Sequence, residues 1–406
     1  MDGSIRSLER ALAAGDEQVR LPLATAYQRL GRAAEAISLL ATLPDPEALA
    51  LSEGLWAEEL RALRPARRIP GARPYGELWG WAGARPVLLE SLLERNAPLA
   101  ARLLGVVDFA LGDFCWELPP RVPHVGRPVG ADSEQILTTG EAPGTFRRHR
   151  IASPGAEPER GVLAEEGQVV ATDRALMWAA LSLTAPGRRE LHLYRLADGA
   201  LGRVAHSGPR ARLSWAVDWE QSRFAWLDGE ALRLGDLAGV EPGRELRQAR
   251  IGPGTRLEAL LGDYALLSEP LQLVALEGGE RVELPRVRGH GPWRLSRDGR
   301  LLLGYRLGLP VAMPLGGVAL RSPTLAPPRG LSRAFWHPHV PVVAVGRADE
   351  GTELRHASGA VVTTLPRDAH PLGWRPDGRG LVVVRRLGPV SGLLELWTPG
   401  GAPPCN

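Results

Sequence analysis

The sequence contains no lysine, and all 49 of its basic residues are arginine in a chain of 406 residues. A lysine amine is needed for a phosphate-binding Walker A loop, for a Schiff base and for a serine–lysine catalytic pair, so these chemistries are excluded. Two explanations of the missing lysine stay open. A GC-rich genome favours codons for Arg, Ala, Gly and Pro, whereas selection against acylation or ubiquitin-like conjugation would also remove lysine.

Cysteine and net charge are also scarce. Cys115 and Cys405 cannot build a disulfide framework, so we expect two free thiols in a reducing compartment. The 46 acidic residues nearly balance the arginines, and a formal net charge of +3 does not favour a nucleic-acid partner. The first residues lack the apolar core of a signal peptide, and the longest apolar run, 99–112, contains Arg102 and Asp108. We therefore predict a cytoplasmic protein that does not bind a membrane.

Sequence signatures of catalysis are missing as well. The chain has no Gly-x-Ser-x-Gly nucleophile elbow and no His-Glu-x-x-His zinc pair. His337 and His339 alternate as two metal ligands on a strand could, but no acidic residue or cysteine is spaced to complete a site. The pair also occupies a position that an Asp-Gly turn fills elsewhere in the chain. We predict no catalytic residue, no metal and no cofactor.

The N-terminal residues have a helical period. Ser4 can cap a first helix that extends to Ala14. Within residues 21–37 the apolar side chains fall on one helical face, and Gly31 separates two helices. The small residues and the Tyr-x-x-x-Gly turn of this stretch resemble a tetratricopeptide repeat over about one repeat unit. Such units need neighbours to bury their faces, so a short helical bundle stays open as the alternative.

Further helical patterns follow this pair. The expected elements are a helix over 47–63, a connector rich in proline and arginine over 64–74, and two short helices over 86–110. Pro119 and Pro120 then end the helical period. The sequence thus predicts an α-helical, tetratricopeptide-like domain over 1–118 and a separable all-β domain over 119–406, with proteolysis expected at 64–74 or 119–127.

The second domain is a repeat of short strands and turns. Histidines mark the repeat at separations of 82, 84 and 80 residues, namely His124, His206, His290 and His370. Each separation is twice a period of about 41 residues, which lies in the range of four-stranded propeller blades. Seven such units fit after residue 119, beginning near residues 122, 160, 207, 252, 288, 329 and 367. The predicted fold class is therefore a helical repeat-like bundle followed by a seven-bladed β-propeller.

The clearest repeat unit is 374–384, in which a Trp precedes a Pro-Asp-Gly turn and a β-branched strand. The segment Gly289-His290, followed by Ser296-Arg297-Asp298-Gly299, resembles the opening of a WD-repeat blade. Residues 132–147 also resemble such an opening, and 394–397 resembles a third strand, with Thr398 where the Asp of the Trp-Asp pair would stand. The resemblance covers residues 122–402 and implies a protein-binding platform without catalysis.

Function is expected where the chain departs from the repeat, because such departures map to loops on one face. An insertion at 185–189 and a proline-rich segment at 310–328 depart most, and their candidate partner-binding residues are Arg188, Arg189, Arg321 and Arg329. We predict a non-catalytic scaffold or adaptor subunit of a bacterial multiprotein complex, with a protein partner of unknown identity. The alternatives are a regulatory or target subunit of a bacterial protein-modification, proteolysis or defence system, and a propeller hydrolase.

Overall fold

The computed structural model describes residues 2–72, 77–91, 102–108, 113–117, 128–140, 142–153, 156–163, 167–173, 176, 178–185, 188–197, 201–207, 214–219, 221–237, 244–245, 251, 255–269, 271–284, 290–306, 309–315, 331–347, 351–387 and 392–400. Its helices are α1 (Asp2–Ala13), the 3-10 helix η1 (Glu17–Val19), α2 (Arg20–Arg29), α3 (Ala33–Leu40) and α4 (Pro46–Arg61). The predicted helices over 4–14, 21–37 and 47–63 are confirmed. Gly31 has φ +70°, so a residue without a Cβ separates α2 from α3.

Strands fill the rest of the described chain and form eight antiparallel sheets. The first three sheets are β2–β5 (Glu77–Ala82, Arg85–Ser91, Arg102–Asp108, Asp113–Glu117), β6–β9 (Pro128–Ala131, Gln135–Thr139, Thr145–Arg150, Glu159–Val162) and β10–β13 (Gln168–Thr172, Trp178–Ala185, Arg188–Arg195, Leu201–Ser207). The next two are β14–β17 (Ser214–Asp218, Arg223–Asp228, Ala231–Asp236, Arg244–Glu245) and β18–β21 (Arg256–Leu261, Tyr264–Ser268, Gln272–Ala275, Arg281–Glu283). The last three are β22–β24 (His290–Leu295, Leu301–Arg306, Leu309–Pro314), β25–β28 (Leu331–Trp336, Val342–Arg347, Gly351–His356, Val361–Thr364) and β29–β31 (Ala369–Trp374, Leu381–Arg386, Gly392–Pro399) joined by β1 (Leu63–Ala72).

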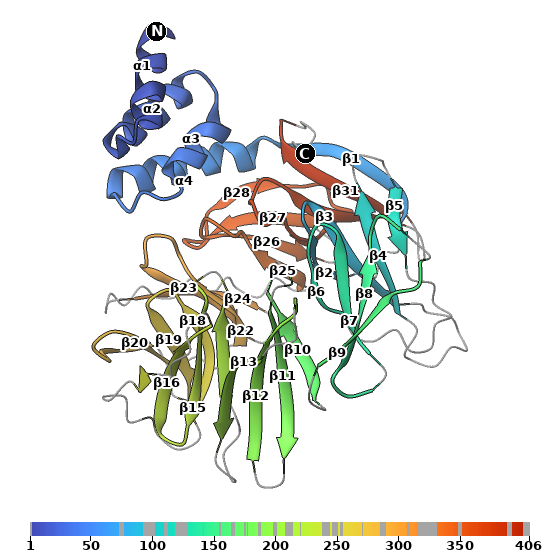
Figure 1. The fold of residues 1–406 in the computed structure, drawn as a ribbon. Coiled ribbons are helices and arrows are strands. Elements are labelled where there is room, and N and C mark those ends of the chain that lie inside the picture. The colour runs from blue at the N-terminus through green and yellow to red at the C-terminus, as the bar shows by residue number, and fades with distance from the viewer. Residues whose placement is uncertain are drawn as a thin grey trace.

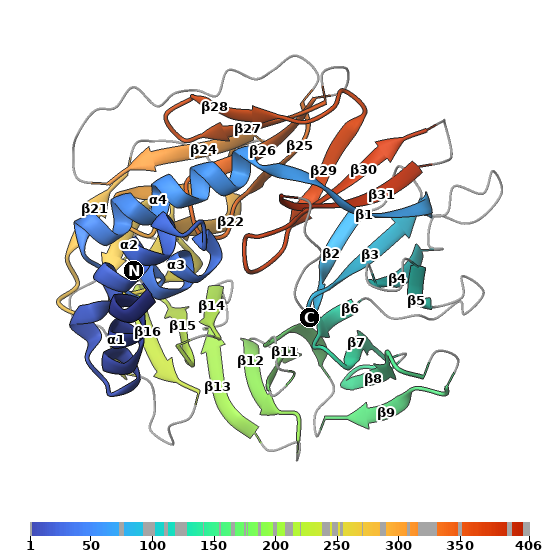
Figure 2. The ribbon, with the colours of Figure 1, turned by 90° about the horizontal axis from the view of Figure 1, so that it is seen from above.

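The sheets are arranged around a common centre, and the helices lie over one end of the ring (Figures 1 and 2). Hydrophobic clusters join each sheet to the next. One cluster packs Ile136 of the second sheet on Val87 of the first, and another packs Phe224 of the fourth sheet on Leu191 of the third. Ile69 and Leu88 share a cluster that joins the last sheet to the first. The hydrophobic core is therefore a series of layers between neighbouring sheets.

Seven sheets follow residue 119, close to the predicted positions, but an eighth precedes them and corrects the predicted number of blades. The two helices predicted over 86–110 are wrong, because this segment contains β3 and β4. Pro86, Val87 and Leu88 are all buried in β3, so these three positions show no alternation of buried and exposed side chains. A strand that is buried on both faces cannot be told from a buried helix by its period.

The predicted connector is also wrong, because residues 63–72 form β1. This strand pairs with β31 in antiparallel register from Leu63 opposite Pro399 to Ala72 opposite Gly392. Glu395 is completely buried in β31, where its carboxylate accepts a hydrogen bond from the Trp397 indole at 2.8 Å. Arg68 of β1 lies 3.0 Å from the same carboxylate. The helices end at Arg61 and not at residue 118, so the β structure begins directly after α4.

Candidate interaction surfaces

The repeated turns of the last three sheets form the surface on which the helices lie. Arg297, in the turn between β22 and β23, donates hydrogen bonds to the carbonyl oxygens of Leu40 and Leu43 at the end of α3. A further bond, 3.1 Å long, joins the Arg297 guanidinium to the Ser52 hydroxyl of α4. A guanidinium at this place satisfies carbonyl groups that have no partner within the helix and interacts favourably with the helix dipole.

The equivalent turn of the last sheet makes a similar contact. Arg379, which follows Asp377 and Gly378, donates a hydrogen bond to the carbonyl oxygen of Ala34 in α3. The Asp377 carboxylate accepts a bond from the Arg379 backbone N–H at 2.9 Å and thereby shapes the turn. Two copies of one repeated turn thus each direct an arginine at the same helix.

The intervening turn carries His337, which is completely buried. Its Nδ1 accepts hydrogen bonds from the backbone N–H groups of His339 and Val340, and its Nε2 donates to the Gly378 carbonyl oxygen at 2.9 Å. Burial lowers the pKa of His337 well below its usual range, because the charged ring would be desolvated. The neutral ring therefore joins two adjacent turns and has no nitrogen left for a metal.

Aromatic contacts complete the junction between helices and sheets. The Trp56 indole of α4 stacks on His339 with the ring centres 5.7 Å apart, and it meets His337 edge-on at 4.7 Å. Leu55 and Leu60 belong to the same hydrophobic cluster as Val342 of β26 and Leu381 of β30. Helices and sheets thus share one core, which argues against two independently packed domains.

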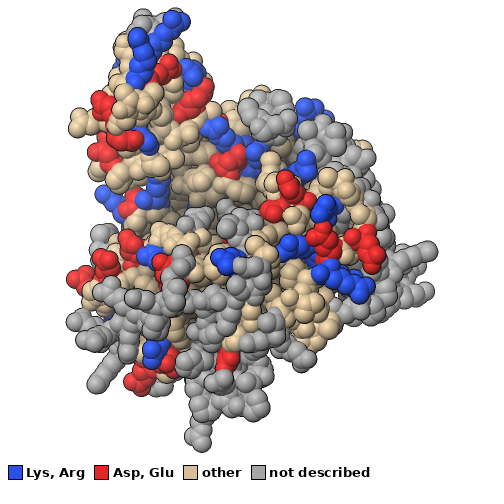
Figure 3. Space-filling model, in the orientation of Figure 1, with Lys and Arg blue, Asp and Glu red and all other residues tan. Residues whose placement is uncertain are grey.

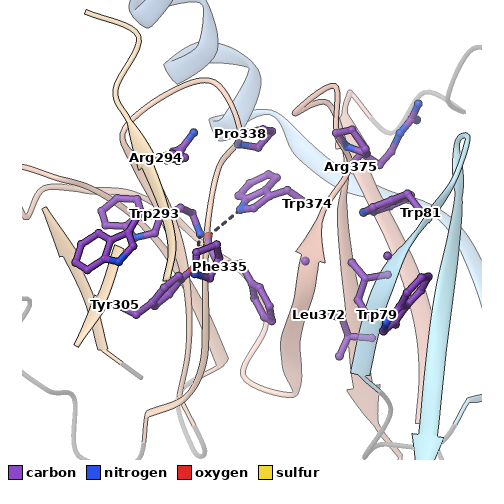
Figure 4. A pocket seen from close by; sticks show the side chains of 16 residues that line it. Trp79, Trp81, Trp293, Arg294, Tyr305, Phe335, Pro338, Leu372, Trp374 and Arg375 are labelled. Carbon is purple, nitrogen blue, oxygen red and sulfur yellow. Dashed lines mark hydrogen bonds between the residues drawn. The ribbon is translucent and has the colours of Figure 1, made fainter. Parts of the chain in front are cut away.

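A cavity of 340 Å³ lies among four consecutive sheets, at β22, β25, β29 and β2 (Figure 4). Seven of the sixteen residues that line it are aromatic, and Trp293, Trp336 and Trp374 occupy equivalent positions of the repeat. Trp79 and Trp81 of β2 form part of the wall, although sequence reasoning placed that segment in the helical domain. Their alternation around Gly80 was the one available sign of a strand there.

Of the predicted partner-binding arginines, Arg188 and Arg189 lie within the described residues. Arg188 opposite Ala185 begins the pairing of β12 with β11, so the predicted insertion is the end of a long hairpin. The positions of Arg321 and Arg329 lie outside the described residues. Figure 3 shows acidic and basic side chains interspersed over the helices and the adjacent sheets, without a large area of one sign among the residues coloured there.

The described residues contain no group of three or more His, Cys, Asp or Glu side chains that could hold a metal ion. Nor does any described helix have the length and apolar character needed to cross a membrane.

No protein-family model matches the chain, and no curated protein sequence matches it. Among solved structures, BamB from Moraxella catarrhalis aligns with 83% of this chain and 99% of its own, at 12% identity and a TM-score of 0.51. The β-propeller domain of Cps50 (Swd1) from Myceliophteria thermophila aligns with 65% of this chain and 92% of its own, at 16% identity and a TM-score of 0.36, which is too low to support a shared fold. The ring of sheets and the likeness to BamB show that the strands of this chain form a β-propeller.

Proposed function

We propose that this protein is a non-catalytic protein–protein interaction scaffold, an adaptor subunit of a bacterial multiprotein complex in the cytoplasm. In this proposal the helices contact one protein and the loops of the propeller contact another. The chain would hold both partners at a fixed separation.

The observation that carries the proposal is the attachment of the helices to the propeller. Arg297 and Arg379 bond to backbone carbonyl groups of one helix segment, and Trp56 packs on the histidine turn between them. Backbone carbonyl groups cannot be lost by side-chain substitution, and a shared core resists rotation of the helices. A rigid junction between two potential binding elements suits a scaffold, since it fixes how bound partners are oriented.

The helices also keep a surface that is available for contact. Leu30, at the end of α2, is a large apolar side chain with 41% of its surface exposed. Arg29 and Arg32 are exposed on either side of it. An apolar side chain between two arginines has the composition found in the contact areas of transient protein complexes.

The test is affinity capture from the native host with the full-length protein, followed by binding measurements with each purified partner. We expect Leu30→Glu to lower the affinity for one partner at least tenfold while the protein stays folded. The double variant Arg188→Glu, Arg189→Glu and a variant with 321–329 replaced by a Gly-Ser linker of equal length should each lower the affinity for another.

A partner whose affinity is unchanged in all three variants would contradict the proposed contact surfaces. Hydrolase turnover by the purified chain, measured with a broad substrate panel, would contradict the proposal that the protein is not catalytic. Ser4→Glu, at an exposed position in α1, is the matched control for the charge introduced at Leu30.

A further inference from the structure

Arg294, a partly buried cation, lines the aromatic cavity and has no carboxylate partner among the described residues. Arg294 of β22 donates one hydrogen bond from its guanidinium to the Val340 carbonyl oxygen at 2.9 Å. No carboxylate of the described residues forms an ion pair with it, and its Nε is buried without a hydrogen-bond partner. Burial lowers the pKa of Arg294 to about 10, although the nearby Tyr305 hydroxyl opposes this effect. A positive charge in this position is costly unless something compensates it.

The rest of the wall offers no acidic group for that purpose. The sixteen lining residues include no Asp and no Glu, and the second lining cation, Arg375, is paired with Asp377 at 2.9 Å. A negatively charged ligand would therefore find a guanidinium that no described carboxylate pairs with, in a mostly apolar lining where an ion pair is stronger than in bulk water. The same argument disfavours a cationic ligand, although aromatic walls can attract cations.

The aromatic side chains of the lining indicate which apolar group the anionic ligand should have besides its charged group. The indole N–H groups of Trp336 and Trp374 are occupied by the carbonyl oxygens of Gly304 and Phe335, each at 2.9 Å. These bonds hold the two rings in place, as the dashed line of Figure 4 shows for Trp374. The indoles of Trp79 and Trp81 are less buried, and they favour stacking by a flat ring.

We propose that this cavity binds an aromatic carboxylate, with the flat ring against the indoles and the carboxylate paired with Arg294. A volume of 340 Å³ lies at the lower end of the range of small-molecule pockets, so one ring system with a short acidic arm is the appropriate size. The inference goes beyond the proposed function, because the cavity and its ligand do not involve the surfaces assigned to protein partners.

The experiment uses the full-length protein and isothermal titration calorimetry with three matched probes. These are indole-3-acetate, its neutral amide indole-3-acetamide, and cyclohexylacetate, which has the charge without the flat ring. We expect indole-3-acetate to bind at least tenfold more tightly than either of the others. Equal affinities of the acid and the amide would overturn the proposal, and this comparison needs no variant.

Substitution of Arg294 then tests whether its guanidinium pairs with the carboxylate of the ligand. Arg294→Gln should reduce the preference for the acid over the amide at least tenfold and leave binding of the amide unchanged. Arg300→Gln is the control, since the Arg300 side chain is 80% exposed and does not line the cavity. A preference that survives Arg294→Gln would overturn the assignment.

The same chemistry could reach the cavity on a free small molecule or on a segment of a protein. A capped Gly-Trp-Asp peptide separates these sources. If the peptide binds more tightly than indole-3-acetate and loses as much affinity in Arg294→Gln, the ligand is a segment of a protein. If the peptide binds more weakly than indole-3-acetate, the ligand is a free acid. Failure of both the acid and the peptide to bind would overturn the proposal.

Discussion

Gly378 and Gly299 occupy the same place in two copies of the repeated turn, and they differ in what a side chain would meet. Both have a left-handed backbone, with φ +72° and φ +67°. A Cβ on Gly299 would meet nothing within 4 Å, whereas a Cβ on Gly378 would lie 2.6 Å from Cε1 and 2.7 Å from Nε2 of His337. Replacement by alanine therefore introduces backbone strain at Gly299, and strain together with a steric clash at Gly378.

The expected magnitudes follow from these two effects. Left-handed backbone in a residue with a Cβ costs about 1–2 kcal/mol, and we expect Gly299→Ala to lower the free energy of unfolding by that amount. Overpacking of a buried site adds about 1–3 kcal/mol, which gives about 2–5 kcal/mol for Gly378→Ala. His337 cannot move aside cheaply, because it is buried, bonds to Gly378 itself and is in ring contact with Trp56 and Trp374.

The assay is urea denaturation at pH 7.5, followed by far-ultraviolet circular dichroism, for the original protein and both alanine variants. The informative quantity is the difference between the two variants, since the strain is common to both. Equal losses of stability, or a larger loss for Gly299→Ala, would refute the reasoning that His337 is fixed beneath Gly378.

Three further predictions concern other contacts. Arg297→Ala should lower the free energy of unfolding by about 1–3 kcal/mol and speed amide hydrogen exchange in α3 and α4, whereas Arg300→Ala should do neither. Glu395→Ala should cost about 1–3 kcal/mol in urea denaturation, because it leaves the buried Trp397 N–H without its acceptor, and Arg68→Ala should cost about 1 kcal/mol or less, since that side chain is 56% exposed and Arg385 stays 3.7 Å from the carboxylate. Burial lowers the pKa of His149 to about 4, so the unfolded chain binds the proton more readily and stability falls as pH drops from about 6.5 to 4, by up to about 3 kcal/mol from this residue. A His149→Asn variant should lose less of its melting temperature over this range, and parallel curves for the two proteins would contradict the assignment.

The sequence was most informative where local chemistry decides the structure. Gly31 between α2 and α3 and the Pro-Asp-Gly turn after Trp374 act within a few residues. The hydrophobic period of the sequence did not identify strands that are buried on both faces. Every residue of β29 is buried, so this strand could be placed only through its repeat, and β3 lay outside the repeat counted from His124.

The candidate site was harder to predict, because its partners are distant in the chain. The repeat identified the turn that contains Arg297, but nothing near Arg297 indicates that its guanidinium bonds to Leu40 and Leu43. His337 lies in the turn between β25 and β26, as the repeat predicted. Arg294 follows a tryptophan of the repeat, and only the three-dimensional arrangement shows that none of the described carboxylates pairs with it.

The pairing of β1 with β31 has a consequence for how the protein is made. β1 leaves the ribosome long before its partner strand β31, because 320 residues of sequence separate Ala72 from Gly392. During that interval its backbone N–H and C=O groups are open to pairing with other chains. Pro65 and Pro70 cannot donate to a neighbouring strand, and arginines at 64, 67 and 68 repel a second copy of the same segment. The prolines and arginines that make this segment resemble a connector thus suit a strand that stays unpaired until β31 has been synthesised. Pairing between such distant segments is expected to be a slow step of folding.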